Sequence, residues 1–185
     1  MISDFLLTLK QQRLLAAVLL RPERNFTFAA LQDIVPGGTG SLYRYVRTLV
    51  DAGVLTSTQI RGSKLYQSNK AHPLYPELRS IAVKTFGVAE PIRDALQPFA
   101  EHIERAFIFG SIVKGSDNFE SDIDIMVVGR VSKGKLLLAL QNTEKLTGRP
   151  VHLNVYGCDE WPAATQDPVI ATILDGPTIE LHLGG

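Results

Sequence analysis

Two carboxylates and a Gly-Ser pair lie close together in the stretch FIFGSIVKGSDNFESDIDIMVVG, residues 107–129. Asp122 and Asp124 are one residue apart at the start of an apolar run, so a strand would project both from the same face. Like charges on one face repel unless a cation lies between them, and carboxylate oxygens suit Mg²⁺. Gly110 and Ser111 follow an earlier apolar run, where backbone N–H groups at the start of a helix favour an anion. The pattern predicts metal-assisted handling of a nucleoside triphosphate.

The elements that must position these residues form a small mixed α/β module. Alternating and continuous apolar runs predict strands at 106–109, 121–128, 151–156 and 178–183. A single helical turn through Lys114 is expected before Gly115, and longer helices are expected at 133–146, 159–165 and 168–174. Within the helix over 133–146, the spacing predicts that Leu136, Leu137, Leu140 and Leu146 face the core.

Charge is distributed unevenly along a chain whose formal net charge is zero. Residues 1–85 hold eleven Lys and Arg against five Asp and Glu, a net charge of +6, and residues 86–185 hold eight against fourteen, a net charge of −6. This charge asymmetry indicates two modules, of which the first could bind a polyanion. The alternative is ordinary compositional scatter. The apolar content of 45% in 185 residues is enough for cores in both.

The number of cysteines and the lengths of the apolar runs indicate the cellular compartment. Cys158 is the single cysteine, which excludes an internal disulfide and favours a reducing compartment. The early apolar run of residues 14–20 is much shorter than the roughly 20 residues needed to span a bilayer. Neither a basic region nor a small-residue cleavage site is evident around this run, so we do not expect a signal peptide. We therefore expect a cytoplasmic protein with no membrane partner.

The first 70 residues have the pattern of three helices followed by a hairpin. Helices are expected from Phe5 to Leu20, from a Thr27 cap to Ile34, and over about 40–52, where Gly53 ends the third. Leu42, Val46 and Leu49 share one face of this third helix. Two β-prone runs on either side of residues 61–63 then predict a hairpin.

This pattern, with LYRYVRTLVDAGVL followed by a basic hairpin, resembles the recognition helix and wing of the bacterial ArsR and MarR-like regulators. The resemblance implies that residues 1–70 form a winged helix-turn-helix that binds double-stranded DNA, with a helix in the major groove and the wing on phosphates. The implied contact residues are Ser41, Tyr43, Arg44 and Arg47 on the helix and Arg61 and Lys64 on the wing. The alternative is a solvated helix face, with a hairpin used for packing or for protein contacts. Residues 71–87 are expected to form a connecting helix whose apolar face could support a homodimer.

The stretch GSIVKGSDNFESDID resembles the motif of the minimal nucleotidyltransferases of the DNA polymerase β superfamily, and the resemblance extends over residues 88–183. It implies an α+β chain overall, with a winged helix-turn-helix in residues 1–70 and a nucleotidyltransferase-like domain in residues 88–185. It also implies that Gly110 and Ser111 hold the triphosphate of ATP or another nucleotide, and that Asp122 and Asp124 bind Mg²⁺. Lys114 is a further candidate for phosphate contact, and Ser121 for orienting the loop.

The sequence departs from this family where a third carboxylate is expected on a following strand. That strand reads VHLNV, residues 151–155, so His152 or Asn154 stands where the family has Asp. An imidazole can accept a proton near neutral pH, and an amide oxygen can ligate a metal without carrying charge. We therefore name Asp122, Asp124, His152 and Asn154 as the catalytic candidates.

Three functions fit these observations. The first is a DNA-tethered enzyme that transfers a nucleoside monophosphate from Mg-NTP to a hydroxyl, including the antitoxin-like case in which the acceptor is a protein. The second is a non-catalytic transcriptional regulator whose second domain senses nucleotide. The third is a protein-interaction module that has lost both ligands.

Overall fold

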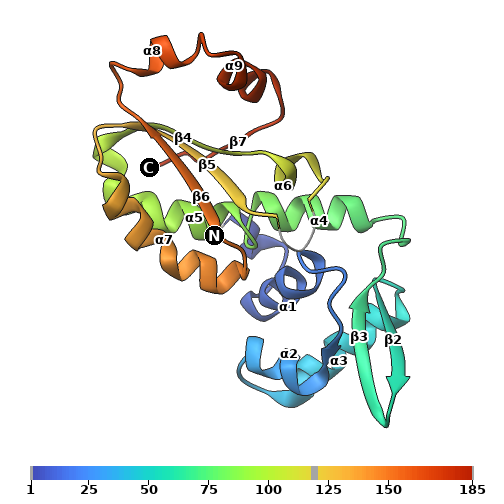
Figure 1. Cartoon of the computed structure of the whole chain (residues 1–185). Coiled ribbons are helices and arrows are strands. Elements are labelled where there is room, and N and C mark those ends of the chain that lie inside the picture. Colours follow the sequence, from blue (N-terminus) through green and yellow to red (C-terminus); the bar gives the residue numbers. More distant parts are fainter. Residues whose placement is uncertain (1, 118–120, 185) are drawn as a thin grey trace. The chain divides into compact units, whose positions relative to one another are not determined.

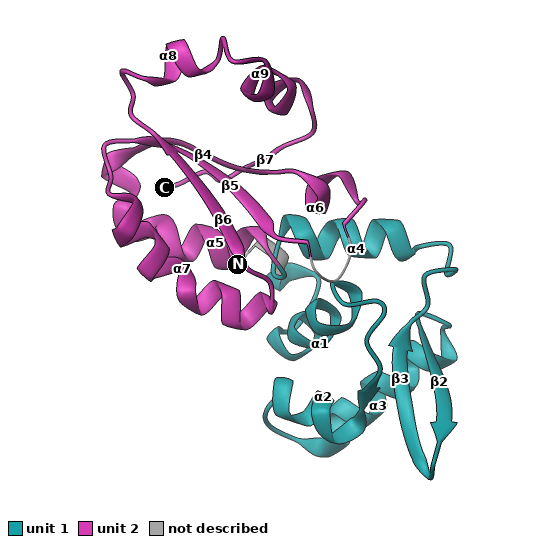
Figure 2. Ribbon diagram, in the orientation of Figure 1, with its two compact units in different colours: residues 1–87 teal, residues 88–185 magenta. Residues whose placement is uncertain are grey.

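The chain folds into two compact units, residues 1–87 and residues 88–185 (Figure 2). The structure is a computed structural model, and it describes residues 2–117 and 121–184. The segment 71–87, which the sequence analysis treats as a connection, lies within the first unit, where its helix packs against the first long helix of the chain.

The first unit combines helices with a small antiparallel sheet (Figure 1). The sheet has the order β1-β3-β2. The elements are η1 (Ile2–Phe5), α1 (Leu9–Leu19), β1 (Phe26–Thr27), α2 (Phe28–Ile34), α3 (Thr39–Asp51), β2 (Leu55–Ile60), β3 (Ser63–Ser68) and α4 (Tyr75–Lys84).

The first predicted helix is divided in the structure. A 3-10 turn ends at Phe5, and α1 begins only after Thr8. Thr8 and Gln11 form a capping box, in which the Thr8 side chain accepts from the Gln11 N–H and the Gln11 side chain accepts from the Thr8 N–H. This capping pattern starts a helix at a fixed residue, which the apolar spacing alone did not reveal. Phe5 and Leu6 are consequently exposed rather than part of a buried stripe.

The helix α3 and the hairpin after it have the predicted form. Leu42, Val46 and Leu49 are buried on one face of α3. The strands β2 and β3 pair from Leu55↔Ser68 to Ile60↔Ser63, which leaves a two-residue turn. Arg61 and Gly62 in that turn both have positive φ, as the twist of a tight hairpin requires.

The second unit is built around a four-stranded sheet of order β6-β5-β4-β7. β5 and β6 are parallel, whereas β4 is antiparallel to both β5 and β7. The elements are α5 (Ala89–Leu96), η2 (Gln97–His102), β4 (Ile103–Phe109), α6 (Ser111–Lys114), β5 (Ile123–Gly129), α7 (Lys133–Thr147), β6 (Val151–Tyr156), α8 (Trp161–Ala164), α9 (Pro168–Asp175) and β7 (Ile179–Glu180).

Both faces of this sheet are covered. α5 and α7 pack together, and α7 packs against β6, while the segment carrying α8 and α9 lies on the opposite side of the sheet in Figure 1. Phe107, Phe109 and Met126 meet Ile170 and Trp161 in the core on the α8–α9 side. In α7, Leu136 and Leu140 are buried as predicted, but Leu137 and Leu146 are 40% and 73% exposed. The buried stripe of α7 is therefore narrower than its leucine content suggests.

At the level of fold class, helices combined with two sheets agree with the predicted α+β chain. Within residues 2–117 and 121–184, no helix is both long and apolar enough to cross a bilayer.

Candidate active site

Asp122 and Asp124 stand where the central strand β5 begins. Asp122 directly precedes the strand and is exposed, while Asp124 is its second residue, with 26% of its side chain exposed. In the sheet, Asp124 lies between Phe109 on β4 and His152 on β6. The buried Ile123 separates the two carboxylates along the chain. A strand with an anchored apolar residue between them thus holds both acids at one end of the sheet.

Gly110 brings the two halves of the motif into contact. Its φ is +82°, and a Cβ on this residue would stand 2.3 Å from Oδ2 of Asp124. No side chain fits that space, so the Asp124 carboxylate packs directly over the Cα of Gly110. The glycine that ends β4 and the acid that begins β5 therefore form one local structure, although 13 residues separate them in the sequence.

After Gly110 the chain makes one helical turn, α6, as the sequence predicts. The Lys114 N–H donates to the Gly110 carbonyl at 3.2 Å, and the Ser116 N–H donates to the Ser111 carbonyl at 3.1 Å. Lys114 is exposed, and its Cε lies 3.9 Å from where a Cβ on Gly176 would stand, just past the end of α9. Ser111 and Lys114 thus lie on a short, internally bonded turn that follows the glycine in contact with Asp124.

His152 and Asn154 occupy different places along β6. His152 is paired with Asp124 in the parallel register, and its Nδ1 lies 3.3 Å from Oδ1 of Asp124. Asn154 is paired with Met126, one step further into the sheet on the same face. Among the described residues, no three His, Cys, Asp or Glu side chains gather closely enough to hold a metal ion by themselves. Of the two candidates, His152 is the one that contacts an acid of the motif.

Two site residues were missed by the sequence analysis. Arg149 and Asp117 form an ion pair of 2.8 Å whose side chains are 2% and 3% exposed. Nη1 of Arg149 also donates to the backbone carbonyl of Ser121 at 3.1 Å. No periodicity or motif spacing distinguishes an arginine between Gly148 and Pro150 from a surface residue, so only the folded structure reveals its burial.

The residues named for DNA contact all lie in the first unit on α3 and the hairpin. On α3, the Ser41 hydroxyl donates to the Gly38 carbonyl at 2.9 Å, and Tyr43 is 51% exposed. The side chains of Arg44 and Arg47 are exposed, and Arg47 makes a surface ion pair of 3.6 Å with Asp51. In the hairpin, Arg61 occupies the turn and Lys64 lies over the Tyr66 ring. α3 therefore presents a polar and cationic face opposite its buried one.

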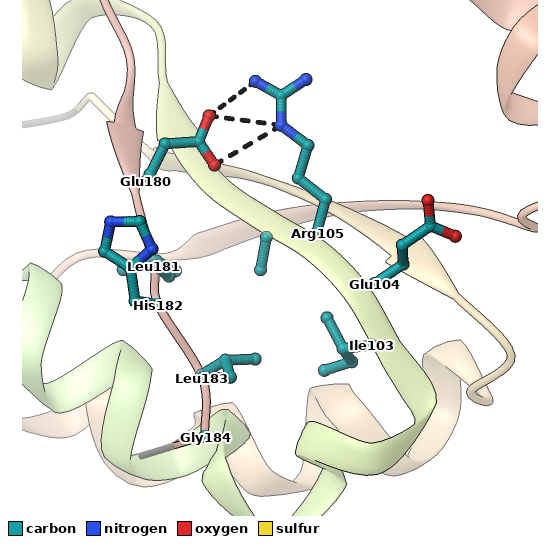
Figure 3. Close-up of a pocket in the computed structure, with 9 residues that line it drawn as sticks. Ile103, Glu104, Arg105, Glu180, Leu181, His182, Leu183 and Gly184 are labelled. Carbon is teal, nitrogen blue, oxygen red and sulfur yellow. Dashed lines mark hydrogen bonds and ion pairs between the residues drawn. The ribbon is translucent and has the colours of Figure 1, made fainter.

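A separate pocket of about 230 Å³ lies along β4 and the end of the chain (Figure 3). It is lined by residues 103–106 and 180–184, and the Arg105–Glu180 ion pair of 2.6 Å lies at its edge. None of the predicted site residues lines it. Hydrogen bonding to the Glu104 carboxylate raises the pKa of the Cys158 thiol.

Comparison with known proteins gives a family match in the second unit. Residues 90–163 match the family described as polymerase beta, nucleotidyltransferase. The matched segment includes Gly110, Asp122, Asp124 and His152. The chain thus contains a nucleotidyltransferase-type segment in its second unit.

Other comparisons are less informative. No match was found among curated proteins. Among solved structures, one similar chain is TrmBL2, an archaeal chromatin protein whose structure is described as showing a novel mode of DNA binding. It is 13% identical, with a TM-score of 0.32, and the alignment covers 95% of this chain and 75% of that one. A TM-score of this size does not indicate a shared fold.

The contact between Gly110 and Asp124 predicts an unusually costly glycine substitution. Gly110→Ala adds a clash with the carboxylate to the cost of a backbone conformation, φ +82° and ψ −156°, that only glycine adopts readily. The matched control makes the same substitution in an Asp124→Ala chain, which keeps the backbone cost and removes the carboxylate. Urea unfolding followed by circular dichroism should give a clearly larger loss of unfolding free energy for Gly110→Ala in the unaltered chain than in the Asp124→Ala chain. Equal losses would show that the carboxylate moves away without cost.

Proposed function

We propose that this protein is a DNA-binding nucleotidyltransferase that transfers a nucleoside monophosphate from Mg-NTP to a hydroxyl. The observation that carries the proposal is the position of Asp124, which is packed over Gly110 on one side and faces His152 on the other. The family match over residues 90–163 supports the reaction class. The more specific assignments below rest on the chemistry of the residues concerned.

Asp122 and Asp124 are the residues that would hold Mg²⁺. Their oxygen donors fit this ion, which binds proteins through one or two carboxylates and completes its coordination with substrate phosphates and water. Two acids at one strand end are therefore a sufficient protein contribution, even though no three-residue cluster exists among the described residues. When bound, Mg²⁺ would neutralise charge on the phosphate oxygens during transfer.

Gly110, Ser111 and Lys114 are the residues that would receive the triphosphate, with ATP as the first nucleotide to test. The absence of a side chain at Gly110 allows a phosphate to approach the backbone, and the Ser111 hydroxyl and the Lys114 ammonium are donors for its oxygens. Ser121 would help to orient Asp122, which follows it directly, because the Ser121 carbonyl is held by Arg149.

His152 is placed to act on the acceptor. Because its Nδ1 faces Asp124, its Nε2 is left to take the proton of a hydroxyl. The hydroxyl oxygen then bonds to the α-phosphorus, and the bond to the leaving pyrophosphate breaks. Asn154, one step further along β6, lies on the same face and would contact substrate rather than transfer a proton.

The first unit is proposed to bind double-stranded DNA as a winged helix-turn-helix. Support comes from three helices followed by a hairpin, and from the exposed residues of α3, Ser41, Tyr43, Arg44 and Arg47, opposite its buried face. The excess of +6 in residues 1–85 would favour a polyanion. Arg61 and Lys64 in the hairpin would contact phosphates, and the protein could bind DNA as a homodimer.

A second function is favoured by the residues on β6. The site has His152 and Asn154 where related enzymes have a third acid, and a nucleotide could therefore bind without being transferred. In that case the protein is a regulator whose DNA affinity changes with bound nucleotide. If transfer does occur, a protein acceptor, as in antitoxin-like relatives, is an alternative to a small molecule.

The transfer reaction can be tested with labelled nucleoside triphosphates, Mg²⁺ and cell extract. Asp122→Asn and Asp124→Asn should each lower the label transferred by about 100-fold or more, since the lost charge stabilisation is worth several kcal/mol. Asp94→Asn, which removes an exposed acid from α5 in the same unit, should transfer label like the unaltered protein. Equal transfer by all these variants would refute the assigned metal site, and nucleotide binding without any transfer would support the regulator.

The third position of the site makes a separate prediction. An aspartate at residue 152 could take the acceptor proton in place of the imidazole and would also add a negative charge beside Asp124, so His152→Asp should raise the rate if that missing charge limits transfer. Asn154→Asp is the matched control, since it adds the same charge beside Met126. Single-turnover rates measured for both variants should rise by about 10-fold for the first and little for the second, a change of about 1.4 kcal/mol. A fall in rate for His152→Asp would instead show that the imidazole itself is needed.

DNA binding can be tested by titrating duplex DNA at several salt concentrations. Arg44→Gln and Arg47→Gln should each weaken binding and reduce the slope of log K against log salt by about 0.9 for each phosphate that is no longer neutralised. Lys84→Gln removes an exposed cation from α4 and serves as the control for net charge. Binding that does not depend on salt, or no binding by the unaltered protein, would contradict the proposal.

A further inference from the structure

We infer that Arg149 is a positioning residue for the acid pair Asp122 and Asp124, acting through its buried ion pair with Asp117. The inference rests on the proposed function, because that function gives the two acids their role as metal ligands. The contacts that support it are made by the Arg149 and Asp117 side chains and by backbone groups, and neither side chain is among the expected nucleotide-binding residues. It would add a further functional residue to the site without making it a contact of substrate or metal.

The ion pair is nearly excluded from solvent. Nη2 of Arg149 lies 2.8 Å from Oδ2 of Asp117, and the two side chains are 2% and 3% exposed. Removing two charges from water is costly, and the cost is recovered only when both remain paired in good geometry. Neither side chain can therefore leave the other at little cost, and the contact joins the two chain segments firmly.

The guanidinium contacts two residues close to the acids in the sequence. Nη2 of Arg149 pairs with Asp117, while Nη1 donates at 3.1 Å to the carbonyl of Ser121, the residue immediately before Asp122. One side chain thus holds Asp117 and the backbone that enters Asp122. This use of two nitrogens requires the planar fork of arginine.

Arg149 is itself held in place by its neighbours. Its backbone N–H donates to the Thr147 hydroxyl at 3.3 Å, and the Val151 N–H donates to Oε1 of Glu144 at 2.8 Å. On the other segment, the Ile123 N–H donates to the Pro150 carbonyl at 2.9 Å.

Asp122 therefore stands between two anchored residues. The carbonyl of Ser121 before it is held by the Arg149 side chain, and the N–H of Ile123 after it is held by the backbone beside Arg149. Asp124 follows in the same strand, opposite His152. The acid pair is consequently positioned before any ligand binds. Such a preorganised site loses little binding free energy to ordering its own residues.

The second unit contains a matched control pair. Arg105 and Glu180 also form an ion pair, at 2.6 Å, but their side chains are 39% and 37% exposed, and they join β4 to β7. Breaking this pair removes one arginine charge from the same unit without altering a contact of Asp117 or Ser121. If the role of Arg149 is specific, substitutions of Arg149 and of Arg105 should have different effects on the start of β5.

The test uses the full chain carrying Arg149→Lys, Asp117→Asn or Arg105→Gln. Arg149→Lys retains the charge but cannot span Asp117 and Ser121, and Asp117→Asn retains the shape but not the charge. Hydrogen exchange of the Ile123 amide, measured without metal, should be at least about 10-fold faster in Arg149→Lys and Asp117→Asn and unchanged in Arg105→Gln. Mn²⁺ affinity, measured by electron paramagnetic resonance, should fall by about 10-fold in the same two variants, as expected when a group that supports a metal ligand is removed.

Each outcome bears on one of the two proposals. Unchanged Ile123 exchange and Mn²⁺ affinity in Arg149→Lys and Asp117→Asn would overturn the positioning role. Loss of exchange protection throughout residues 88–185 in both variants would also overturn it, since the pair would then support the whole unit rather than the start of β5. Faster Ile123 exchange together with no Asp122-dependent Mn²⁺ binding by the unaltered protein would support the positioning of the strand end and refute the proposed metal site instead.

Discussion

The structure of the second unit depends on the packing of the Asp124 carboxylate over the Cα of Gly110. A side chain at residue 110 would overlap the acid, with 2.3 Å between its Cβ and Oδ2. The end of β4, the start of β5 and the turn of α6 must therefore meet at one point. Because β6 is parallel to β5, the same point also receives His152. The strand β5 lies between β4 and β6. A turn, an acid and an imidazole therefore meet at one end of this sheet.

Buried charge has a different role from exposed charge in this protein. The exposed cations of α3 and the hairpin can be altered with little effect on folding, because solvent screens them. Arg149 and Asp117 are almost completely buried, and each depends on the other. The protein therefore has replaceable charges on the surface of its first unit, and a buried ion pair next to the start of β5 that cannot be broken cheaply.

The sequence predicted the parts of the fold that depend on local rules. The hairpin followed from two β-prone runs on either side of residues 61–63, and the buried face of α3 followed from the spacing of Leu42, Val46 and Leu49. The failures came from competing local chemistry. The capping box at Thr8 starts α1 later than the apolar spacing suggested, and α7 buries fewer leucines than it contains because it meets the sheet along a narrow stripe.

The site was predicted as a set of residue types, but its geometry was not. The spacing of Asp122 and Asp124 indicated a shared strand face, whereas no pattern could choose between His152 and Asn154. That choice depends on the register of two strands whose pairing is set by the rest of the sheet. The burial of Arg149 is equally non-local, since it depends on contacts with Asp117 and Ser121, about 30 residues earlier in the chain.

The edge position of β6 has an evolutionary consequence. The side chain of His152 is 62% exposed on the terminal strand of the sheet, so substitutions there leave the core intact. Gly110 and Asp124 have no such freedom, because each fills the space that the other leaves. A lineage could therefore exchange the residue at position 152 by a single codon change that selection for folding would not oppose. The packed end of the sheet and the side chain exposed beside it can diverge at different rates within one small domain.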